Sequence, residues 1–231
     1  MKVSIIIPVF NERATIGEVL DRVLALPFKK EVIVVDDGST DGTTEFLSEY
    51  QPDVIRVHFN RLNFGKGTAI RIGLTYVTGD IVAIQDADLE LVPEELVQLL
   101  EAFKDESVDV VYGSRFLCPN PGIPRLTRIA NRFLTGLTNL LFGSRLTDME
   151  TAYKLFRRKA IQGLELTCRR FEFEPEVTAK LLRAGYAIHE IPISYRPRRA
   201  YEGKKIGWGD GITAIETLVR CRLGRSGMPG R

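Results

Sequence analysis

Two aspartates separated by one residue, Asp86 and Asp88, are the residues of this sequence best suited to chemistry. They follow an apolar run, Ile81–Gln85, that is typical of a buried strand, and residues two apart in a strand share one face. Two carboxylates at that spacing can hold one hard divalent cation, and Mg²⁺ takes its remaining oxygens from phosphates and water. The pair therefore predicts an enzyme that handles a nucleotide diphosphate. The alternative is a pair of carboxylates that only cap a turn or a helix.

Polar clusters also follow the other predicted strands of the first half. They are Asn11-Glu12, Asp36–Asp41 and Asn63–Gly67, which follow strands expected over 3–8, 31–36 and 54–59. Because ligands of open α/β sheets bind outside the carboxyl ends of the strands, clusters that share one edge indicate a binding site. Asp37 can accept hydrogen bonds from a nucleobase or ribose, or it can cap a helix. Gly65 and Gly67 either let backbone approach a ligand or mark only a loop.

Strands and helices alternate through the first half of the chain. Further strands are expected over 81–85 and 108–113, and helices over 14–26, 42–50, 68–77 and 93–103. Continuous apolar strands that alternate with amphipathic helices predict an α/β fold, a mostly parallel sheet covered by helices on both faces. In the less regular second half we expect a linker at 119–124, helices over 125–142, 176–183 and 211–223, and strands near 156 and over 187–195.

Composition excludes several classes of protein. With 231 residues, 44% hydrophobic and 27% charged, the chain can bury the core of a globular protein. A net charge of +2 gives no reason to expect a nucleic-acid partner, and three widely spaced cysteines fit neither a disulfide framework nor a zinc site. We find no signal peptide and no apolar run of about 18 residues that could span a membrane. These features predict a cytoplasmic protein.

The segment Arg125–Phe142 is amphipathic. Its apolar stripe consists of Leu126, Ile129, Phe133, Leu137, Leu140 and Leu141. Arg125, Arg128 and Arg132 lie off that stripe, and the segment has no acidic residue. Basic side chains beside an apolar face favour reversible attachment to an anionic membrane surface, here the cytoplasmic face. The alternative is a helix that packs on the sheet and keeps its arginines in water.

Taken together, these motifs resemble those of the family 2 inverting glycosyltransferases of GT-A fold, and within them the dolichol-phosphate mannose synthase group of polyprenol-phosphate sugar transferases. The matching pieces, in the family order, are Pro8–Glu12, Asp36–Asp41, Gly65–Gly73, Asp86–Glu90, Gly113–Arg115, Thr147-Asp148, Glu190–Tyr195 and Gly203–Lys205. They extend over roughly residues 3–210, and the set is far more specific than any one piece.

The resemblance implies roles on the donor side. Pro8 and Glu12 resemble the family's base and ribose contacts, with Asp37, Gly65 and Lys66 completing the nucleotide-sugar site. Asp86 and Asp88 match the metal and diphosphate ligands, which makes Asp88 a catalytic candidate and the cofactor Mg²⁺ or Mn²⁺. Glu90 is the third candidate ligand and stands where the family often has glutamine.

The acceptor side needs cations, because a phosphate acceptor is anionic. The candidates are Arg115, Arg128, Arg132, Arg199, Lys204 and Lys205, and Arg115 is also a catalytic candidate. Glu202–Lys205 stands where the family more usually has arginine-glycine-serine-lysine. Since a phosphate is already a nucleophile at neutral pH, no strong base is required. Asp148 either orients the donor or acts as a base, or it caps a loop.

The sequence therefore predicts a metal-dependent inverting glycosyltransferase. Its donor is a nucleotide diphosphate-sugar of the GDP-mannose or UDP-glucose type, and its acceptor is a dolichyl or undecaprenyl phosphate. We expect one domain over 1–223, with a nucleotide-sugar half at 1–115, an acceptor half at 116–223 and a flexible tail at 224–231. The alternatives are a family 2 enzyme with a saccharide or small soluble acceptor, a nucleotidyltransferase that makes nucleotide sugars, and a non-catalytic nucleotide-binding module.

Overall fold

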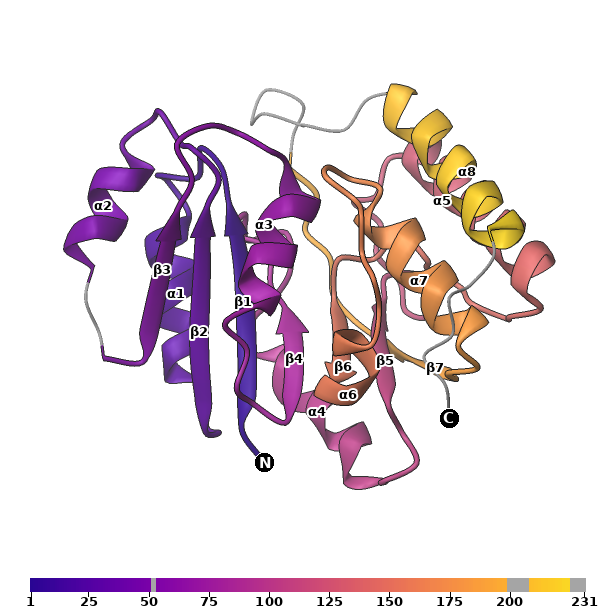
Figure 1. Ribbon diagram of the computed structural model, residues 1–231, viewed down its shortest axis with the longest axis horizontal. Helices are drawn as coiled ribbons and strands as arrows, with labels where there is room; N and C mark the ends of the chain where they lie inside the picture. The colour runs from indigo at the N-terminus through magenta and orange to yellow at the C-terminus, as the bar shows by residue number, and fades with distance from the viewer. Residues whose placement is uncertain (51–52, 199–207, 225–231) are drawn as a thin grey trace.

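The computed structural model describes residues 1–50, 53–198 and 208–224. Within these ranges seven strands form one sheet in the order β3-β2-β1-β4-β6-β5-β7 (Figure 1). The strands are β1 (Val3–Val9), β2 (Lys30–Asp36), β3 (Ile55–Phe59), β4 (Ile81–Ile84), β5 (Val110–Ser114), β6 (Lys154–Arg157) and β7 (Ile188–Pro192). Four of the six strand pairs in this sheet are parallel, which confirms the predicted fold class.

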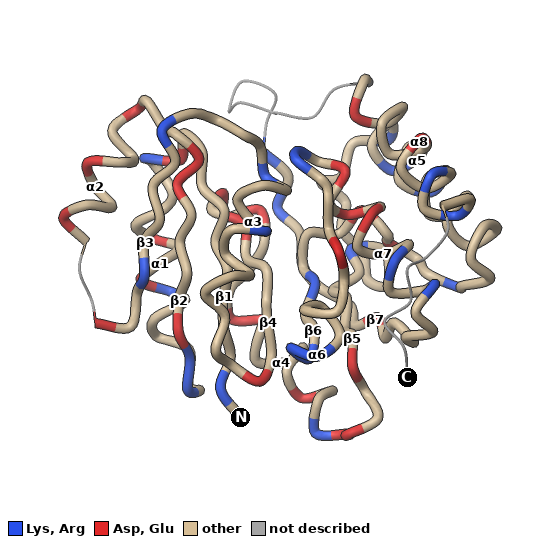
Figure 2. The backbone as a smooth tube through the Cα atoms, viewed as in Figure 1, with Lys and Arg blue, Asp and Glu red and all other residues tan. Residues whose placement is uncertain are grey.

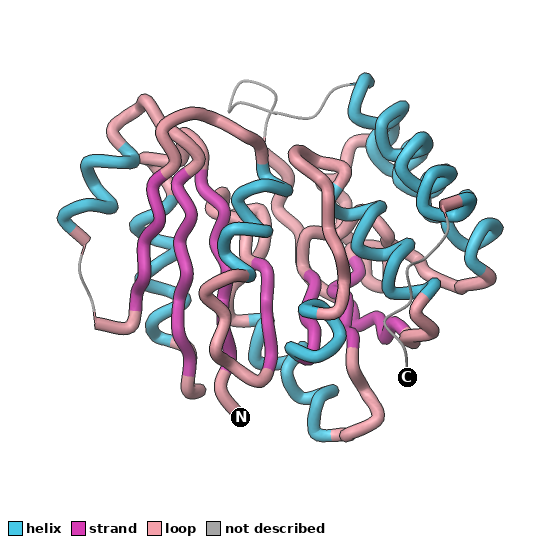
Figure 3. The backbone as a smooth tube through the Cα atoms, in the orientation of Figure 1, coloured by secondary structure: helices cyan, strands magenta, loops and turns pink. Residues whose placement is uncertain are grey.

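Helices cover both faces of the sheet (Figure 3). They are α1 (Ile16–Ala25), α2 (Thr43–Glu49), α3 (Lys66–Leu74), α4 (Glu95–Glu101), α5 (Arg125–Phe142), α6 (Arg158–Gln162), α7 (Phe173–Arg183) and α8 (Trp208–Leu223), with a 3-10 turn at Ala102–Lys104. Helices α1, α2 and α4 pack on one face, and α3, α6 and α7 on the other. Helices α5 and α8 pack against α7 at the β7 end of the sheet. In the described ranges no helix has the length and apolarity needed to cross a bilayer.

The alternation of side chains along β1 explains the two cores. Ile5 and Ile7 are fully buried against the α1 side, whereas Ile6 is fully buried against the α3 side. A strand with both faces covered has no polar face, and its apolar run is therefore continuous.

Strand β6 runs against the direction of both its neighbours. It pairs antiparallel with β4 on one side and with β5 on the other. Its amino end therefore lies at the same edge of the sheet as the carboxyl ends of β4 and β5. The segment 147–153, which enters β6, must cross the edge at which we expect the ligand.

Several element boundaries depart from the sequence predictions by up to three residues. Helix α7 begins at Phe173, three residues before the expected start, because Pro175 falls in its first turn, where a missing N–H breaks no helical hydrogen bond. Strand β7 ends at Pro192. The Ile193 N–H still donates to the Ser114 carbonyl, but beyond it the amides bond side chains: Ser194 N–H donates to Glu95 and Tyr195 N–H to Asn120. The short helix α6 was not predicted.

Candidate active site

Asp37 lies at the end of β2 and holds the loop that follows β3. Its buried carboxylate accepts hydrogen bonds from Asn60 Nδ2 at 2.8 Å, Phe64 N at 3.1 Å and Gly65 N at 2.6 Å. The carboxylate therefore positions this loop beside the ends of β1 and β2. A contact between Asp37 and a nucleobase stays a prediction. A contact between the nucleobase and Pro8, which is half-buried near the end of β1, also stays a prediction.

The glycines around Lys66 allow close approach of another part of the chain. A Cβ atom on Gly65, whose φ is +98°, would lie 2.5 Å from the Arg169 carbonyl oxygen, and one on Gly67 would lie 3.0 Å from that of Arg170. Gly67 N–H donates to Arg170 O at 3.0 Å. The chain itself thus explains both glycines, without a ligand at that point.

Lys66 links two carboxylates across the site. Its ammonium lies 2.9 Å from Asp86 Oδ1 and 3.0 Å from Glu174 Oε1. Burial alone would lower the pKa of Lys66, but Asp86 and Glu174 outweigh that effect and raise it. The lysine is therefore a fixed positive charge beside Asp86. Glu174, on α7, has no signal in the sequence beyond the acidic run 172–176.

Arg198 bridges two of the predicted donor-site carboxylates. Its Nη2 atom lies 2.7 Å from Glu12 Oε2 and 3.3 Å from Asp88 Oδ2. Sequence reasoning chose Arg199, which belongs to the same basic run but lies outside the described residues. It did not choose Arg198, which reaches the β4 edge. Asp88 thus has one protein cation beside it, and Asp86 has another.

Glu90 holds the chain segment that carries Arg198. Glu90 Oε1 accepts the Arg198 backbone N–H at 2.8 Å, and Oε2 accepts the Tyr195 hydroxyl at 2.6 Å. Between Asp88 and Glu90, Leu89 adopts a φ of 59°, a conformation that bulky side chains rarely take. Backbone strain of this kind collects at functional loops.

Asp86 and Asp88 fit a divalent cation better than Glu90 does. Their side chains are each about one-fifth exposed, so both reach solvent at the sheet edge. Both oxygens of Glu90 hold the 195–198 segment. In contrast, Asp86 contacts the Lys66 side chain, and Asp88 contacts the Arg198 side chain and the Glu90 amide. No group of three His, Cys, Asp or Glu side chains among the described residues is arranged to hold a metal. A cation here would therefore take two protein carboxylates and complete its shell with phosphate and water.

Arg115 and Asp148 form a buried, bidentate ion pair. Arg115 Nε lies 2.7 Å from Oδ2 and Arg115 Nη2 2.8 Å from Oδ1, and the Arg115 amide also donates to Oδ2. Asn131 Nδ2 donates to Oδ1 at 2.7 Å, so the fully buried Asp148 accepts four hydrogen bonds. Burial acts to lower the pKa of Arg115, but Asp148 raises it overall. The geometry suits Asp148 as the residue that orients Arg115.

Arg115 and Arg128 converge on one aromatic ring. Each guanidinium carbon lies 5.8 Å from the centre of the Phe116 ring. Arg132, one turn further along α5, is exposed. Of the other predicted acceptor-phosphate residues, Arg199, Lys204 and Lys205 lie outside the described residues.

The segment that enters β6 brings a buried lysine into the site. Lys154 is fully buried, donates to the Met149 and Thr151 carbonyls, and lies 4.2 Å from the centre of the Tyr112 ring. Burial lowers its pKa to about 8. Its neighbour Glu150 has a pKa raised to about 7, by burial first and then by Glu174. Sequence reasoning missed both residues, because neither stands at the end of a predicted strand.

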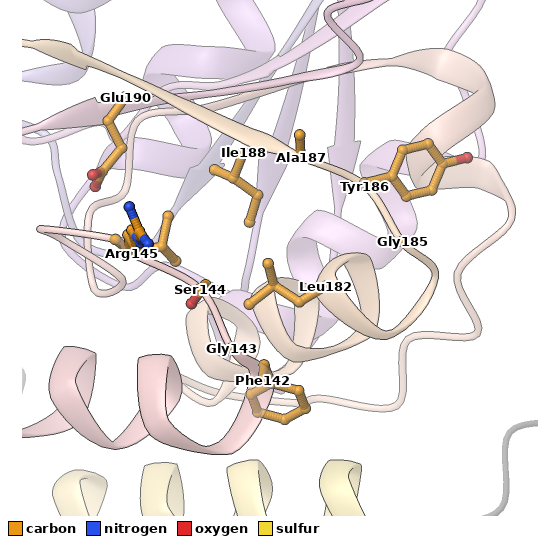
Figure 4. Close-up of a pocket in the computed structure, with 11 residues that line it drawn as sticks. Phe142, Gly143, Ser144, Arg145, Leu182, Gly185, Tyr186, Ala187, Ile188 and Glu190 are labelled. Carbon is orange, nitrogen blue, oxygen red and sulfur yellow. The ribbon is translucent and has the colours of Figure 1, made fainter.

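A separate cavity of about 370 Å³ lies at the opposite end of β7 (Figure 4). It is lined by the end of α5, the end of α7 and the residues around the start of β7, including Leu182, Tyr186 and Ile188. Strand β7 begins beside this cavity at Ile188 and ends at Pro192, near the candidate active site. None of the predicted site residues that the structure describes lines the cavity.

Solved structures share this fold. The chain superposes on glucosyl-3-phosphoglycerate synthase of Mycobacterium tuberculosis in complex with Mn²⁺, uridine diphosphate and phosphoglyceric acid, with a TM-score of 0.74 and 23% identity over 98% of this chain and 80% of that one. A complex of the same enzyme with Mg²⁺ and uridine diphosphate gives a TM-score of 0.72 at 24% identity, with 98% of this chain and 81% of that one covered. At this level of identity the match shows the GT-A fold.

Curated relatives are closer in sequence. Undecaprenyl-phosphate 4-deoxy-4-formamido-L-arabinose transferase of Edwardsiella ictaluri is 32% identical over 227 residues, 95% of this chain and 67% of the relative. The same enzyme of Klebsiella pneumoniae is 31% identical over 228 residues, with the same shares covered. The family model described as glycosyl transferase family 2 matches residues 4–164, which include every donor-side residue predicted from the sequence. The chain thus belongs to glycosyl transferase family 2 and is a glycosyltransferase.

Proposed function

We propose that this enzyme transfers a sugar from a nucleoside diphosphate to a polyprenyl phosphate at a membrane surface. The donor side rests on the loops at the carboxyl ends of β1, β2 and β4, which carry Glu12, Asp37, Asp86 and Asp88. The acceptor side rests on Arg115 and Arg128, and on curated relatives whose name specifies undecaprenyl phosphate.

Asp86 and Asp88 are proposed to hold Mg²⁺ or Mn²⁺ together with the donor diphosphate. When bound, the cation stabilises the negative charge that develops on the departing nucleoside diphosphate. Lys66, fixed as a cation beside Asp86, adds positive charge at the same edge. Glu90 is proposed to hold the 195–198 segment, so that Arg198 stays close to Glu12 and Asp88.

Arg115 and Arg128 are proposed to bind the acceptor phosphate. Arg115 is held in place by Asp148, and Arg128 by a hydrogen bond to the Asn120 carbonyl at 3.1 Å. Arginine presents a rigid fork of donors that matches phosphate oxygens. A phosphate bound here would face the donor carboxylates across the amino end of β6.

The observation that carries the acceptor class is an apolar stripe on α5 that faces away from the protein. Its exposed members are Leu126 (57%), Ile129 (64%), Phe133 (61%) and Leu140 (82%). The opposite face, with Asn131, Leu134, Thr135 and Thr138, is buried. Figure 2 marks basic positions along the same helix. A helix with an exposed apolar stripe and flanking arginines fits the headgroup region of an anionic membrane, where a polyprenyl phosphate presents its phosphate.

An acceptor with a sugar hydroxyl would need a general base, because a hydroxyl is a poor nucleophile. Asp148 or another carboxylate was the expected candidate. It is fully buried, and its two oxygens accept hydrogen bonds from Arg115 and Asn131. This geometry favours the phosphate acceptor.

The test is release of nucleoside diphosphate from a panel of UDP- and GDP-sugars with Mg²⁺ or Mn²⁺, with and without undecaprenyl phosphate in anionic vesicles. We expect turnover only with the metal and the lipid phosphate. Asp88→Asn should reduce turnover by at least a hundredfold, whereas Asp53→Asn, an exposed aspartate just before β3, should leave it unchanged. Turnover that does not need the lipid, or an active Asp88→Asn enzyme, would contradict the proposal.

A further inference from the structure

Glu150 is a half-buried acid, and its buried Oε1 atom lacks a hydrogen-bond partner. In the described part of the chain, two buried side-chain oxygens accept no hydrogen bond, Asp109 Oδ1 and Glu150 Oε1. Asp109 Oδ1 lies 3.0 Å from the Lys159 ammonium, so its charge is balanced. Glu150 has no ion pair or hydrogen bond through its side chain to any described residue. Because buried polar atoms are normally hydrogen-bonded, an orphaned oxygen calls for a ligand or another explanation.

The backbone on both sides of Glu150 is fixed. Met149 N–H donates to Thr135 Oγ1 at 3.1 Å, and the Lys154 ammonium binds the carbonyls of Met149 and Thr151 at 2.8 and 2.5 Å. The neighbours of Glu150 are thus held in place, while its own Oε1 atom has no hydrogen-bond partner. Such preorganisation is what a ligand-binding side chain needs.

Sheet topology places Glu150 between the donor and acceptor sides. Asp86 and Asp88 follow β4, and Arg115 follows β5. Strand β6 lies between β4 and β5 and runs against both, so the segment before it crosses the gap between the two loops. In the proposed reaction the transferred sugar must lie between the diphosphate and the acceptor phosphate, and hence over this segment.

The charges around Glu150 select the kind of group that it can bind. Glu174, Lys154, Arg115 and Asp148 all lie near enough to influence its charge. The nearby Lys154 and Arg115 disfavour a further cation, and the carboxylates Glu174 and Asp148 disfavour a phosphate. A neutral hydrogen-bond donor, such as a hydroxyl group, is repelled by neither set of charges and can supply the missing hydrogen bond.

We propose that Glu150 binds a hydroxyl group of the donor sugar and thereby contributes to sugar selection. This inference rests on the proposed function, since it needs a nucleoside diphosphate-sugar in the site. Glu150 would be a specificity-determining residue that touches the sugar and neither the nucleotide nor the lipid.

The experiment compares the affinity of the full chain for a nucleoside diphosphate with its affinity for the corresponding sugar nucleotide. Isothermal titration with Mn²⁺ would use UDP, GDP, UDP-glucose, UDP-galactose, UDP-N-acetylglucosamine and GDP-mannose. The variants are Glu150→Gln and Glu150→Ala, with Glu106→Gln, an exposed glutamate in the turn before β5, as the matched control. Melting temperatures of all four proteins are recorded beside the titrations.

We expect the wild-type enzyme and Glu106→Gln to bind at least one sugar nucleotide more tightly than its diphosphate. In Glu150→Ala the ratio of sugar-nucleotide affinity to diphosphate affinity should fall by about tenfold to a hundredfold, which is the effect of losing a hydrogen bond to a charged acceptor. The affinity for the diphosphate should stay unchanged. Glu150→Gln should show a smaller loss in the same direction. Neither variant should melt below the wild type, since the oxygen that is removed has no protein partner.

Three outcomes would overturn the inference. One is an unchanged advantage for the sugar nucleotide in both variants; another is a wild-type enzyme that binds no sugar nucleotide more tightly than its diphosphate. The third is an equal loss of diphosphate and sugar-nucleotide affinity together with a lower melting temperature, which would make Glu150 a structural residue. If the wild-type enzyme binds neither UDP nor GDP, the proposed function itself fails.

Discussion

At the scale of single residues, the acids of the site are held by cations of the protein. Asp86 contacts Lys66, Asp88 contacts Arg198, and Asp148 contacts Arg115. Each pair orients a carboxylate at the sheet edge. The pairs differ in exposure, because Asp148 is fully buried whereas Asp86 and Asp88 reach solvent.

The Arg115–Asp148 pair predicts strong coupling in stability. Removing one partner leaves a buried charge unpaired, so Arg115→Met and Asp148→Asn should each lower the free energy of unfolding by about 3–5 kcal/mol. The double variant should lose clearly less than the sum of the two, because no unpaired charge remains. Urea denaturation of the four proteins measures this. Additive losses would mean that the pair is not coupled in solution.

Glu150 predicts a pH dependence of stability. Its pKa is about 7 in the folded protein against an ordinary 4.5, so between those values the folded state binds more protons than the unfolded state. The free energy of unfolding therefore falls as pH rises through this window, by about 1.4 kcal/mol for each unit of pKa difference. Glu150→Gln should remove this loss and stabilise the protein more at pH 8 than at pH 5.

The measurement is thermal unfolding of wild type and Glu150→Gln at pH 5 and pH 8, with Glu106→Gln as control. If the stability difference between Glu150→Gln and wild type is the same at both pH values, Glu150 does not titrate in this window.

The residue scale also shows where sequence reasoning reaches its limit. The positions of Asp86, Asp88 and Arg115 could be predicted, because each directly follows an apolar strand. The partners of these residues could not. Arg198 lies more than a hundred residues from Glu12 and Asp88 along the chain, and only the folded loop brings them together. Glu150 has no local signal, since its environment is made by α7, β5 and β6.

At the scale of elements, close packing sets the demands on small residues. A Cβ atom on Gly73, in α3, would lie 2.6 Å from Ile6 Cγ2 in β1, whereas one on Gly136, in α5, would meet nothing within 4 Å. The same substitution should therefore have opposite effects in two helices.

Gly73→Ala should lower the free energy of unfolding by about 1–3 kcal/mol, the usual effect of overpacking. Gly136→Ala should raise it by about 0.5–1 kcal/mol, because alanine favours the helix and meets no obstacle. Chemical denaturation of both variants gives the comparison, and each serves as the control for the other. A destabilised Gly136→Ala protein would show that the outer face of α5 is covered in solution.

The exposed stripe of α5 predicts binding to anionic vesicles. Phe133→Ser/Leu140→Ser should reduce cosedimentation at least fivefold without loss of stability, because both side chains are more than half exposed. High salt should weaken binding of the wild type, since it screens the flanking arginines. Val54→Ser, at an exposed apolar residue before β3, is the matched control. If the wild type and both variants remain in the supernatant to the same extent with vesicles as without them, this membrane contact is ruled out.

Element types were easier to predict than strand direction. The alternation of apolar strands and amphipathic helices identified β1 to β5 and α1 to α4, and α5 has the predicted bounds. The direction of β6 has no signature in its four residues, Lys154–Arg157, which include a fully buried lysine. That lysine is explained only by the two carbonyls it binds, and these become visible once the loop is folded.

At the scale of the whole molecule, the two halves of the sequence share their cores. On one face of the sheet, Ile5 and Val34 pack in the same cluster as Tyr153 and Leu155, and on the other face Ile6 packs with Phe156 and Phe173. Neither half can bury its apolar surface without the other. We therefore propose that the donor and acceptor halves are regions of one folding unit rather than separable modules.

A shared core predicts that 1–223 unfolds in one cooperative step. Far-ultraviolet and near-ultraviolet circular dichroism should give coincident urea transitions, because both report the same event. The fragment 1–115 should show little native structure, since it loses the partners of Ile6 and Ile84 on β6 and α7. Two separate transitions, or a fragment 1–115 that unfolds cooperatively, would point to independent halves.

The position of β6 has a consequence for biosynthesis. Until β6 pairs with it, β4 is an edge strand of four buried apolar residues, Ile81–Ile84, and unpaired apolar edges favour association between chains. Its partner, Lys154–Arg157, leaves the ribosome only after the long intervening stretch has been made, several seconds later at about 5–20 residues per second. The nascent polypeptide thus passes through an interval in which its centre is exposed to aggregation. Translation speed and chaperone supply during that interval should govern how much enzyme a cell recovers.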